Sequence, residues 1–256
     1  MSSASTSKEN DIKWITPTWS VPASIHAFTT TRSGGVSQAP FDSLNLGDHV
    51  NDSPIAVQKN RELLVAKANL PQFPVYLTQT HSTRVIRLPY AGDNLEADAV
   101  YTNQANQVCL VMTADCLPAV FCSKDGQQIA AAHAGWRGLC DGILEATVAE
   151  FSGEPSELCV WLGPAISQKA FQVGQDVVDQ FCAIDAQAIQ AFVPDSNQQG
   201  KFWGDLYLLA RQRLHRLGIH DISGGEHCTY TEESLFFSYR RDNKTGRMAT
   251  LIWRSE

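Results

Sequence analysis

Apolar residues along the chain fall into short runs that are rich in β-branched side chains and are bounded by turn residues. Runs of this length and composition predict β-strands, and several lack polar alternation, which is typical of strands buried on both faces. The predicted strands are 24–30, 75–81, 84–89, 98–102, 107–113, 118–122, 128–134, 157–163, 234–240 and 247–253. The last two enclose a turn-rich segment, 241–246, which favours a hairpin there.

Three other segments, 55–70, 136–151 and 205–218, carry apolar residues at the spacing of an amphipathic helix. No repeat or long linker divides the chain. The pattern therefore predicts a mixed α/β fold, in which residues 13–256 form a single catalytic domain with a largely buried mixed β-sheet core covered by helices. Residues 1–12 are polar and rich in serine, and we expect them to form a disordered tail.

Charge and cysteine content indicate which partners and which cellular compartment suit the protein. The 256 residues include 20 Lys+Arg and 27 Asp+Glu, a formal net charge of −7, which disfavours nucleic-acid and anionic membrane partners. The seven cysteines lie mostly in apolar runs, and no secretory signal or run long enough to span a bilayer is visible. We expect a cytoplasmic protein, with no protein partner evident from the sequence.

Chemically capable residues end or follow three of the predicted strands, in the segments 79–82, 113–116 and 132–138. If these strand ends are adjacent, His81, Cys116 and His133 come together. Two imidazoles and a thiolate are suitable ligands for Zn²⁺, and three protein ligands leave a fourth position open for catalysis. The spacing matches no local zinc-finger pattern, so this prediction depends on the fold.

Other interpretations of these residues stay open at this point. Each residue taken alone is more often part of a core than of a site. Cys116 and His133 also suit a metal-free thiolate–imidazolium dyad for acyl transfer or deamidation, although such a dyad does not need His81. A third alternative is a binding module in which the same cluster holds a structural metal.

Glycine-rich and arginine-bearing loops are candidates for anion binding. Arg32 with Gly34 and Gly35 resembles a backbone nest beside a bidentate cation, or else a plain turn. Arg137 stands where a helix is predicted to begin, where backbone N–H groups attract anions. Asn45 is a candidate orienting side chain, and Arg240 and Arg241 offer cations on the predicted strand 234–240 and just after it.

Five segments in order resemble hallmark motifs of the YfiH-type family: QTHSTRV, TADCLPAVF, AAAHAGWRGL, GPAIS and FFSYRRD followed by TGR. Members of this family have been described as laccase-domain polyphenol oxidases and as purine nucleoside phosphorylases, and have been linked to peptidoglycan editing. The resemblance implies a fold shared with certain cysteine hydrolases. It also places metal ligands on His81, Cys116 and His133.

The resemblance implies zinc-dependent phosphorolysis of adenosine, inosine and S-methyl-5′-thioadenosine to a free base and a (thio)ribose 1-phosphate, with adenosine deamination as a side activity. On this interpretation Cys116, His133, Asp115 and Arg137 are catalytic. The substrate and phosphate contacts are Arg32, Gly34, Gly35, Asn45, Gln79 and Arg240.

A copper-associated polyphenol oxidase and a cysteine hydrolase or amidase acting on a peptidoglycan precursor are the alternatives. Seven histidines without a His-x-His pair do not suit a full multicopper centre. Copper in a mononuclear site remains an alternative to zinc, because copper binds such donors more tightly.

Overall fold

A computed structural model of the chain describes residues 12–256. Its centre is a six-stranded sheet in the order β12-β8-β6-β7-β4-β3. Most of its strands are antiparallel, but β12 is parallel to β8 and β3 is parallel to β4. The strands are β3 (Val85–Arg87), β4 (Ala99–Thr102), β6 (Leu117–Ser123), β7 (Ile129–Ala134), β8 (Leu158–Leu162) and β12 (Asp221–Gly224).

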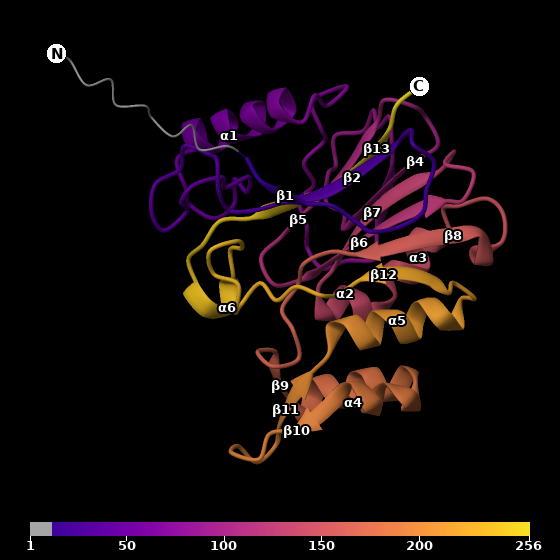
Figure 1. Cartoon of the computed structure of the whole chain (residues 1–256). Helices are drawn as coiled ribbons and strands as arrows, with labels where there is room; N and C mark the ends of the chain where they lie inside the picture. Colours follow the sequence, from indigo (N-terminus) through magenta and orange to yellow (C-terminus); the bar gives the residue numbers. More distant parts are fainter. Residues whose placement is uncertain (1–11) are drawn as a thin grey trace.

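A second sheet packs against one face of the first (Figure 1). Its order is β1-β2-β13-β5, so the strand nearest the C-terminus lies between two earlier strands and is antiparallel to both. Apolar residues between the two sheets form one of the buried clusters. The strands are β1 (Trp14–Ile15), β2 (Ile25–Thr30), β5 (Val108–Thr113) and β13 (Met248–Arg254).

Helices cover the outer faces of this pair of sheets (Figure 1). Helix α1 (Pro54–Lys67) packs on the four-stranded sheet, and the Ser53 side chain caps its first turn. The opposite outer face carries α2 (Trp136–Asp141), α3 (Ile143–Val148) and α5 (Leu206–Arg216), and α4 (Gln175–Ile184) lies farther from this sheet, in contact with α2. The result is the mixed α/β fold that the sequence predicts.

Smaller elements complete the described chain. A three-stranded antiparallel sheet in the order β10-β11-β9 lies beside α4 (Figure 1). Its strands are β9 (Gln172–Gly174), β10 (Phe192–Pro194) and β11 (Lys201–Gly204). Two 3₁₀ turns, Pro155–Glu157 and Ala186–Ala191, and the short helix α6 (Tyr239–Asp242) make up the rest.

Two predicted strands, one predicted helix and the predicted hairpin were wrong, and one helix was missed. Residues 75–81 form no strand and make only an isolated bridge at Thr78. The predicted helix 136–151 is two helices, because Gly142 adopts φ 103° and breaks it. Residues 234–240 are not a strand, and with them the predicted hairpin is lost, since residues 239–242 form α6 instead. Helix α4 was not predicted.

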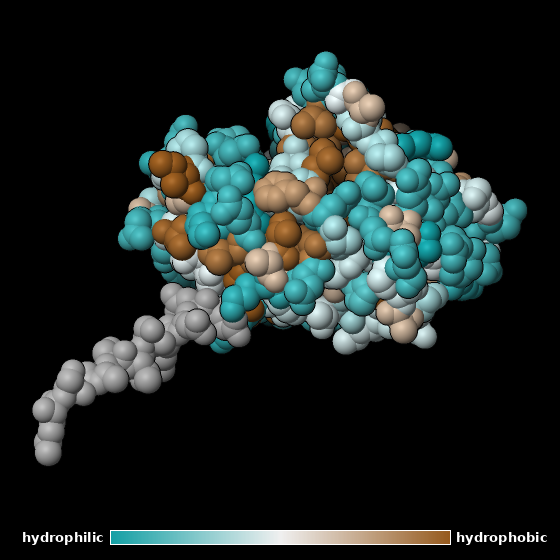
Figure 2. Space-filling view, turned by 90° about the horizontal axis from the view of Figure 1, so that it is seen from above, coloured by the Kyte–Doolittle hydropathy of each residue, from teal (hydrophilic) through white to brown (hydrophobic). Residues whose placement is uncertain are grey.

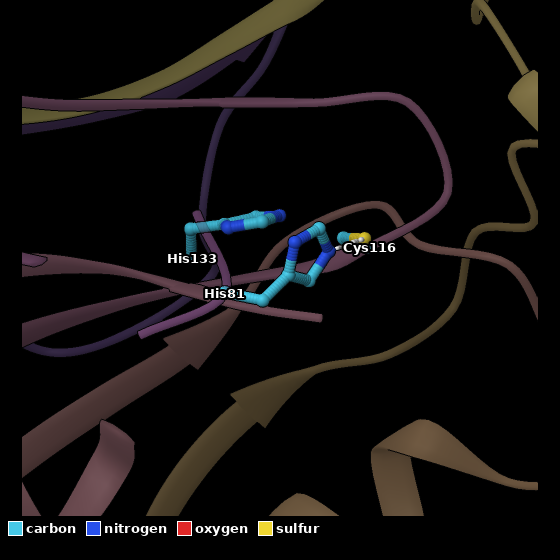
Figure 3. Close-up of side chains that lie close together, drawn as sticks. All are labelled: His81, Cys116 and His133. Atoms are coloured by element: carbon cyan, nitrogen blue, oxygen red, sulfur yellow. Dashed lines mark hydrogen bonds between the residues drawn. The ribbon is translucent and has the colours of Figure 1, made fainter. Parts of the chain in front are cut away.

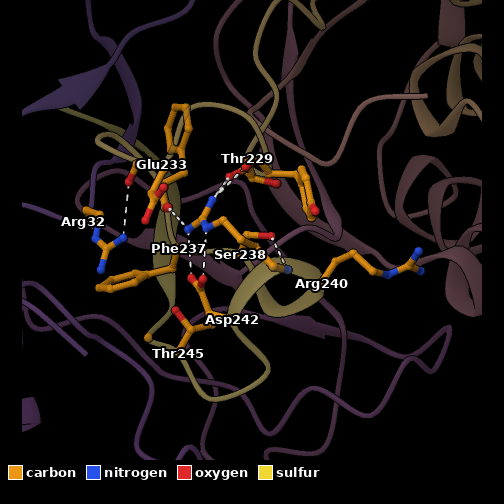
Figure 4. Close-up of polar contacts among 12 residues, drawn as sticks. Arg32, Thr229, Glu233, Phe237, Ser238, Arg240, Asp242 and Thr245 are labelled. Carbon is orange, nitrogen blue, oxygen red and sulfur yellow. Dashed lines mark hydrogen bonds and ion pairs between the residues drawn. The ribbon is translucent and has the colours of Figure 1, made fainter. Parts of the chain in front are cut away.

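The segment before α6 is held by side-chain hydrogen bonds rather than by strand pairing (Figure 4). The Arg241 guanidinium donates to the backbone oxygens of Thr229, Tyr230 and Phe236, and forms an ion pair with Asp242. The bond to Phe236 O and a bond from the Arg32 N–H to Leu235 O satisfy carbonyls of the predicted strand that a strand partner would otherwise take. An apolar run that is buried in this way looks like a strand in sequence.

The first described residue is buried, and large apolar side chains are scattered over the surface of the described chain. The predicted tail lies outside the described residues except for Ile12, which is buried against Gly34. The face in Figure 2 is mainly hydrophilic with apolar patches, and exposed large apolar side chains of the described chain include Trp14, Ile55 and Phe73. Within residues 12–256 no helix is long and apolar enough to cross a membrane.

Candidate metal centre and its cavity

The predicted cluster of His81, Cys116 and His133 forms (Figure 3). Their ligand atoms lie within 4.8 Å of one another. Cys116 Sγ is 3.7 Å from His81 Nε2, and the two imidazole rings meet edge to face with centroids 4.9 Å apart. His133 is buried, whereas His81 and Cys116 are partly exposed, so the cluster is reached from one side.

The backbone brings these residues together differently from the predicted row of strand ends. Cys116 immediately precedes β6 and His133 is near the end of β7, and in this antiparallel pair Pro118 lies opposite His133. The sulfur and one imidazole therefore come from a single β6–β7 pairing. His81 comes from a loop, where it adopts φ 61°.

Asp98, a residue that the sequence analysis did not single out, fixes this loop and His133 together. It is fully buried just before β4. His133 Nδ1 donates to Asp98 Oδ1 at 2.8 Å, which leaves Nε2 available to a metal ion. The backbone N–H of His81 also donates to Asp98 Oδ1, and three more donors from Thr80 and Ser82 bind Oδ2. A carboxylate behind a histidine is the usual way to orient a metal-ligating imidazole.

Electrostatics favour a thiolate in the cluster. Burial raises the pKa of Cys116, but the positive charge of His133 and hydrogen bonds from both imidazoles lower it to about 6. Burial lowers the pKa of His133, but Cys116 and Asp98 raise it to about 9. Burial raises the pKa of Asp98, and the bonds from His133 and Ser82 lower it to about 2. The deprotonated sulfur is the form that binds metals and acts as a nucleophile.

Gly135 leaves the space that the cluster occupies. A Cβ at this position would lie 2.4 Å from His81 Cδ2, 2.7 Å from His81 Nε2 and 3.1 Å from Cys116 Sγ. Real Cβ atoms do not approach other atoms so closely, so only glycine fits between β7 and α2. The glycine in the Ala-His-Ala-Gly-Trp segment is thus part of the site geometry.

The cluster lies in the wall of a cavity of about 520 Å³. Three arginines, Arg137, Arg240 and Arg247, line this cavity. Aromatic and apolar side chains form much of the remaining wall: Met112, Ala114, Trp136, Ile166, Phe171, Leu206 and Tyr239. A volume of this size, with apolar walls and a few convergent polar groups, is typical of a small-molecule site.

Four of the predicted contacts reach the cavity: Gln79, Asp115, Arg137 and Arg240. The Gln79 amide is bonded at both ends to the backbone of Met112 and shapes the wall. Asp115 adopts φ 92°, and its two carboxylate oxygens accept from the Thr229 hydroxyl and the Arg240 N–H.

The two cavity arginines among these contacts are held differently. Arg137 is exposed and stacks on Trp136. Arg240 donates to Gln172 O and approaches the Phe171 ring.

The other four predicted contacts lie away from this cavity. Arg32 is paired with Asp42 and donates to Glu233 O over the ring of Phe237 (Figure 4). The N–H groups of Gly34 and Gly35 both donate to Ser43 Oγ, so they bind the chain itself. The loop is therefore a plain turn, the second of the two interpretations that the sequence allowed, because its hydrogen-bond donors already have partners within the protein.

Asn45 acts behind the cavity wall. It is fully buried, and its Oδ1 accepts from the N–H groups of Gly47 and Arg247. Arg247 and His49 line the cavity and were not predicted, and Thr113, which also lines it, lies in the predicted segment 113–116 but was given no role there. The only sequence signal for Arg247 was its place in the TGR segment, which gives no role to the arginine.

Comparisons with known proteins agree with this architecture. Residues 26–255 match the family described as "Multi-copper polyphenol oxidoreductase laccase". A protein of Haemophilus influenzae named purine nucleoside phosphorylase is 62% identical over 239 residues, covering 93% of this chain and 98% of that protein. The purine nucleoside phosphorylase YfiH of Escherichia coli is 52% identical over 244 residues, covering 94% and 98%.

A solved structure extends the likeness to three dimensions. The crystal structure of a Neisseria meningitidis protein superposes with a TM-score of 0.90 at 49% identity, covering 95% of this chain and 99% of the other. The match of the family over nearly the whole chain, the near-complete coverage of the relatives and the shared fold lead to one conclusion. The chain belongs to the YfiH-type family of laccase-domain proteins.

Proposed function

We propose that the protein is a zinc-dependent purine nucleoside phosphorylase acting on adenosine, inosine and S-methyl-5′-thioadenosine. The observation that carries this proposal is the His81–Cys116–His133 cluster in the wall of a cavity that also holds three arginines. The names of the H. influenzae and E. coli relatives support the same activity.

The donor set fits Zn²⁺. For metal–ligand bonds of about 2.0–2.3 Å, the ligand atoms of a tetrahedron are roughly 3.5 Å apart. The 3.7 Å between Cys116 Sγ and His81 Nε2 agrees with this spacing. Asp98 orients His133 from behind, and Gly135 leaves room in front. When bound, a zinc ion with an open position supplies a Lewis acid that stabilises negative charge.

Phosphorolysis breaks the C1′–N9 bond of the nucleoside while a phosphate oxygen bonds to C1′. The chain must hold a dianion next to a sugar that develops positive charge. The cavity arginines supply the cations, and Trp136, Phe171 and Tyr239 offer ring faces against which a purine can stack. Asp115 positions the Arg240 backbone, since both of its oxygens are already engaged.

The decisive assay is phosphate-dependent release of hypoxanthine from inosine, measured together with zinc content. We expect Cys116→Ser to lose zinc and activity, and His81→Ala to stay folded but inactive. Unfolding of His81→Ala would instead indicate a structural metal. Ammonia release from adenosine tests deamination, which we propose as a side activity of the same cavity.

A metal-free cysteine hydrolase is a second candidate. Cys116, His133 and Asp98 form a thiolate–imidazole–carboxylate chain, in which Asp98 is 2.8 Å from His133. This arrangement suits acyl transfer on an amide, including one in a peptidoglycan precursor. Amide turnover by chelator-treated protein that shows no phosphorolysis would favour this candidate.

The name of the matched family makes a copper oxidase the third candidate. Among residues 12–256, only His81, Cys116 and His133 form a group of three side chains able to hold a metal ion. A multicopper centre needs further metal sites, and these residues offer none. Copper can replace zinc at the one cluster. Metal analysis of the purified protein and oxygen uptake with a catechol distinguish the two metals.

A further inference from the structure

Arg247 differs from the other arginines of the cavity in its surroundings. Its guanidinium donates Nη1 to the backbone oxygens of Thr245 and Gly246, and the Tyr239 ring is 6.0 Å away. Within residues 12–256 no carboxylate forms an ion pair with it. The negative groups near it are the Asp115 carboxylate and the Cys116 sulfur, and neither forms an ion pair with it, so this half-buried cation on the cavity wall can still bind an anion from outside.

An unsatisfied hydroxyl belongs to a second residue that lines the same cavity. Thr113 is the last residue of β5 and pairs with Met248, which directly follows Arg247. Thr113 is 1% exposed, and its Oγ1 has no hydrogen-bond partner although the residue lines the cavity. A buried hydroxyl without a partner costs free energy unless a ligand supplies one. Arginine and threonine together form a donor set for an oxyanion.

The loop before α1 holds Arg247 in place. Asn45 Oδ1 accepts from the Arg247 N–H, and Leu46 N–H donates to Arg247 O. Gly47 lies flat against the side chain, because a Cβ there would be 2.8 Å from Arg247 Cγ. The segment 43–47, in which sequence reasoning placed a direct ligand contact at Asn45, therefore positions the arginine instead.

We propose that Arg247 and Thr113 form the binding site for the phosphate co-substrate, with Asn45 and Gly47 as positioning residues. This inference rests on the proposed phosphorolysis for its role, but the anion site itself follows from the geometry. The ligand is a tetrahedral oxyanion, which can come from inorganic phosphate or from the phosphate group of a nucleotide. Arg137 and Arg240 also line the cavity, but both are exposed, whereas Arg247 is half-buried.

Two variants test the site in different ways. Arg247→Lys keeps the charge and removes the planar fork, and Gly47→Ala keeps the arginine and displaces its stem. Arg216→Lys, at an exposed ion pair at the end of α5, is the matched control. In inosine phosphorolysis we expect the KM for phosphate to rise about 10-fold to 100-fold in Arg247→Lys, the loss of one charge-assisted contact. The KM for inosine should change much less, and Arg216→Lys should match the wild type.

A binding measurement separates this inference from the proposed function. Calorimetric titration of the wild type and of Arg247→Lys with inorganic phosphate alone should show weaker phosphate binding by the variant. A parallel titration uses inosine monophosphate, and binding of this nucleotide without binding of inorganic phosphate would identify a nucleotide as the source of the phosphate group. Arg247-dependent phosphate binding by a protein without phosphorolysis would support the site and overturn the function. An unchanged phosphate KM and unchanged phosphate binding in folded Arg247→Lys would overturn the site.

Discussion

Replacement of Asp98 by asparagine should weaken metal binding and folding together. Asp98 accepts two hydrogen bonds at Oδ1, from His81 N and His133 Nδ1, and three at Oδ2, from Thr80 and Ser82. The asparagine amide keeps one acceptor and turns an NH₂ group toward donors at the other position. Either orientation loses two or three hydrogen bonds to a buried charge.

The expected size follows from these contacts. A hydrogen bond to a charged group contributes about 1.5–3 kcal/mol, and bonds that share one acceptor are coupled rather than additive. We expect Asp98→Asn to lower the free energy of unfolding by about 3–5 kcal/mol. Loss of the partner behind a ligating histidine lowers metal affinity about 10-fold to 100-fold.

The assay is competition for zinc with a chromophoric chelator, together with urea unfolding of the metal-free protein. Asp93→Asn is the control, because Asp93 is an exposed aspartate in the segment between β3 and β4. Ser82→Ala removes a single bond to Asp98 and covers the case in which Asp98→Asn does not fold. Wild-type zinc affinity and wild-type unfolding in folded Asp98→Asn would refute the role given to this carboxylate.

Three further outcomes follow from the same structure. Gly135→Ala should abolish zinc binding and cost about 1–3 kcal/mol in urea unfolding through overpacking, because its Cβ would overlap His81; unchanged zinc binding would contradict the geometry. In chelator-treated protein, iodoacetamide should alkylate Cys116 with a midpoint near pH 6, because the pKa of Cys116 is lowered and its thiolate persists above that pH. Burial and acidic neighbours raise the pKa of Cys182, so Cys182 should react only at higher pH. Mass spectrometry of the two peptides measures the order of reaction. Phe121→Ala, at a fully buried position of β6, should destabilise the fold by about 3–5 kcal/mol in urea unfolding without altering the zinc stoichiometry of the folded protein.

Sequence patterns predicted the central strands well because those strands are buried on both faces. The segments 107–113, 118–122 and 128–134 are continuous apolar runs, and β5, β6 and β7 agree with them to within a residue or so. The same signal failed at 234–240, where Phe236 and Phe237 are equally buried, but Phe236 O accepts from Arg241 and the Phe237 N–H donates to Met248 Sδ. Apolar composition reports burial, and it does not report which partner satisfies the backbone.

The candidate metal ligands could be selected from the sequence because their chemistry is uncommon, and the rest of the site was less predictable. His81, Cys116 and His133 are soft or borderline donors next to apolar runs, which marks them as candidates in the sequence, but only the fold brings them together. Asp98 and Arg247 act through tertiary contacts with residues far away in sequence, and an Asp or Arg at a strand end has many other uses. Arg32 with its two glycines has the composition of an anion nest, yet the donors are already used inside the loop. The Arg32 side chain donates to Asp42 O, and the N–H groups of both glycines donate to Ser43 Oγ.

The position of β13 between β2 and β5 has a consequence for synthesis of the protein on the ribosome. Residues 25–30 and 108–113 emerge long before 248–254, and each then presents one strand edge that lacks its eventual neighbour. Until β13 is synthesised, neither edge has the strand that covers it in the folded protein. A polypeptide that ends before Arg247 would therefore leave both strand edges open and would lack the arginine of the proposed oxyanion site, although it would still contain His81, Cys116 and His133.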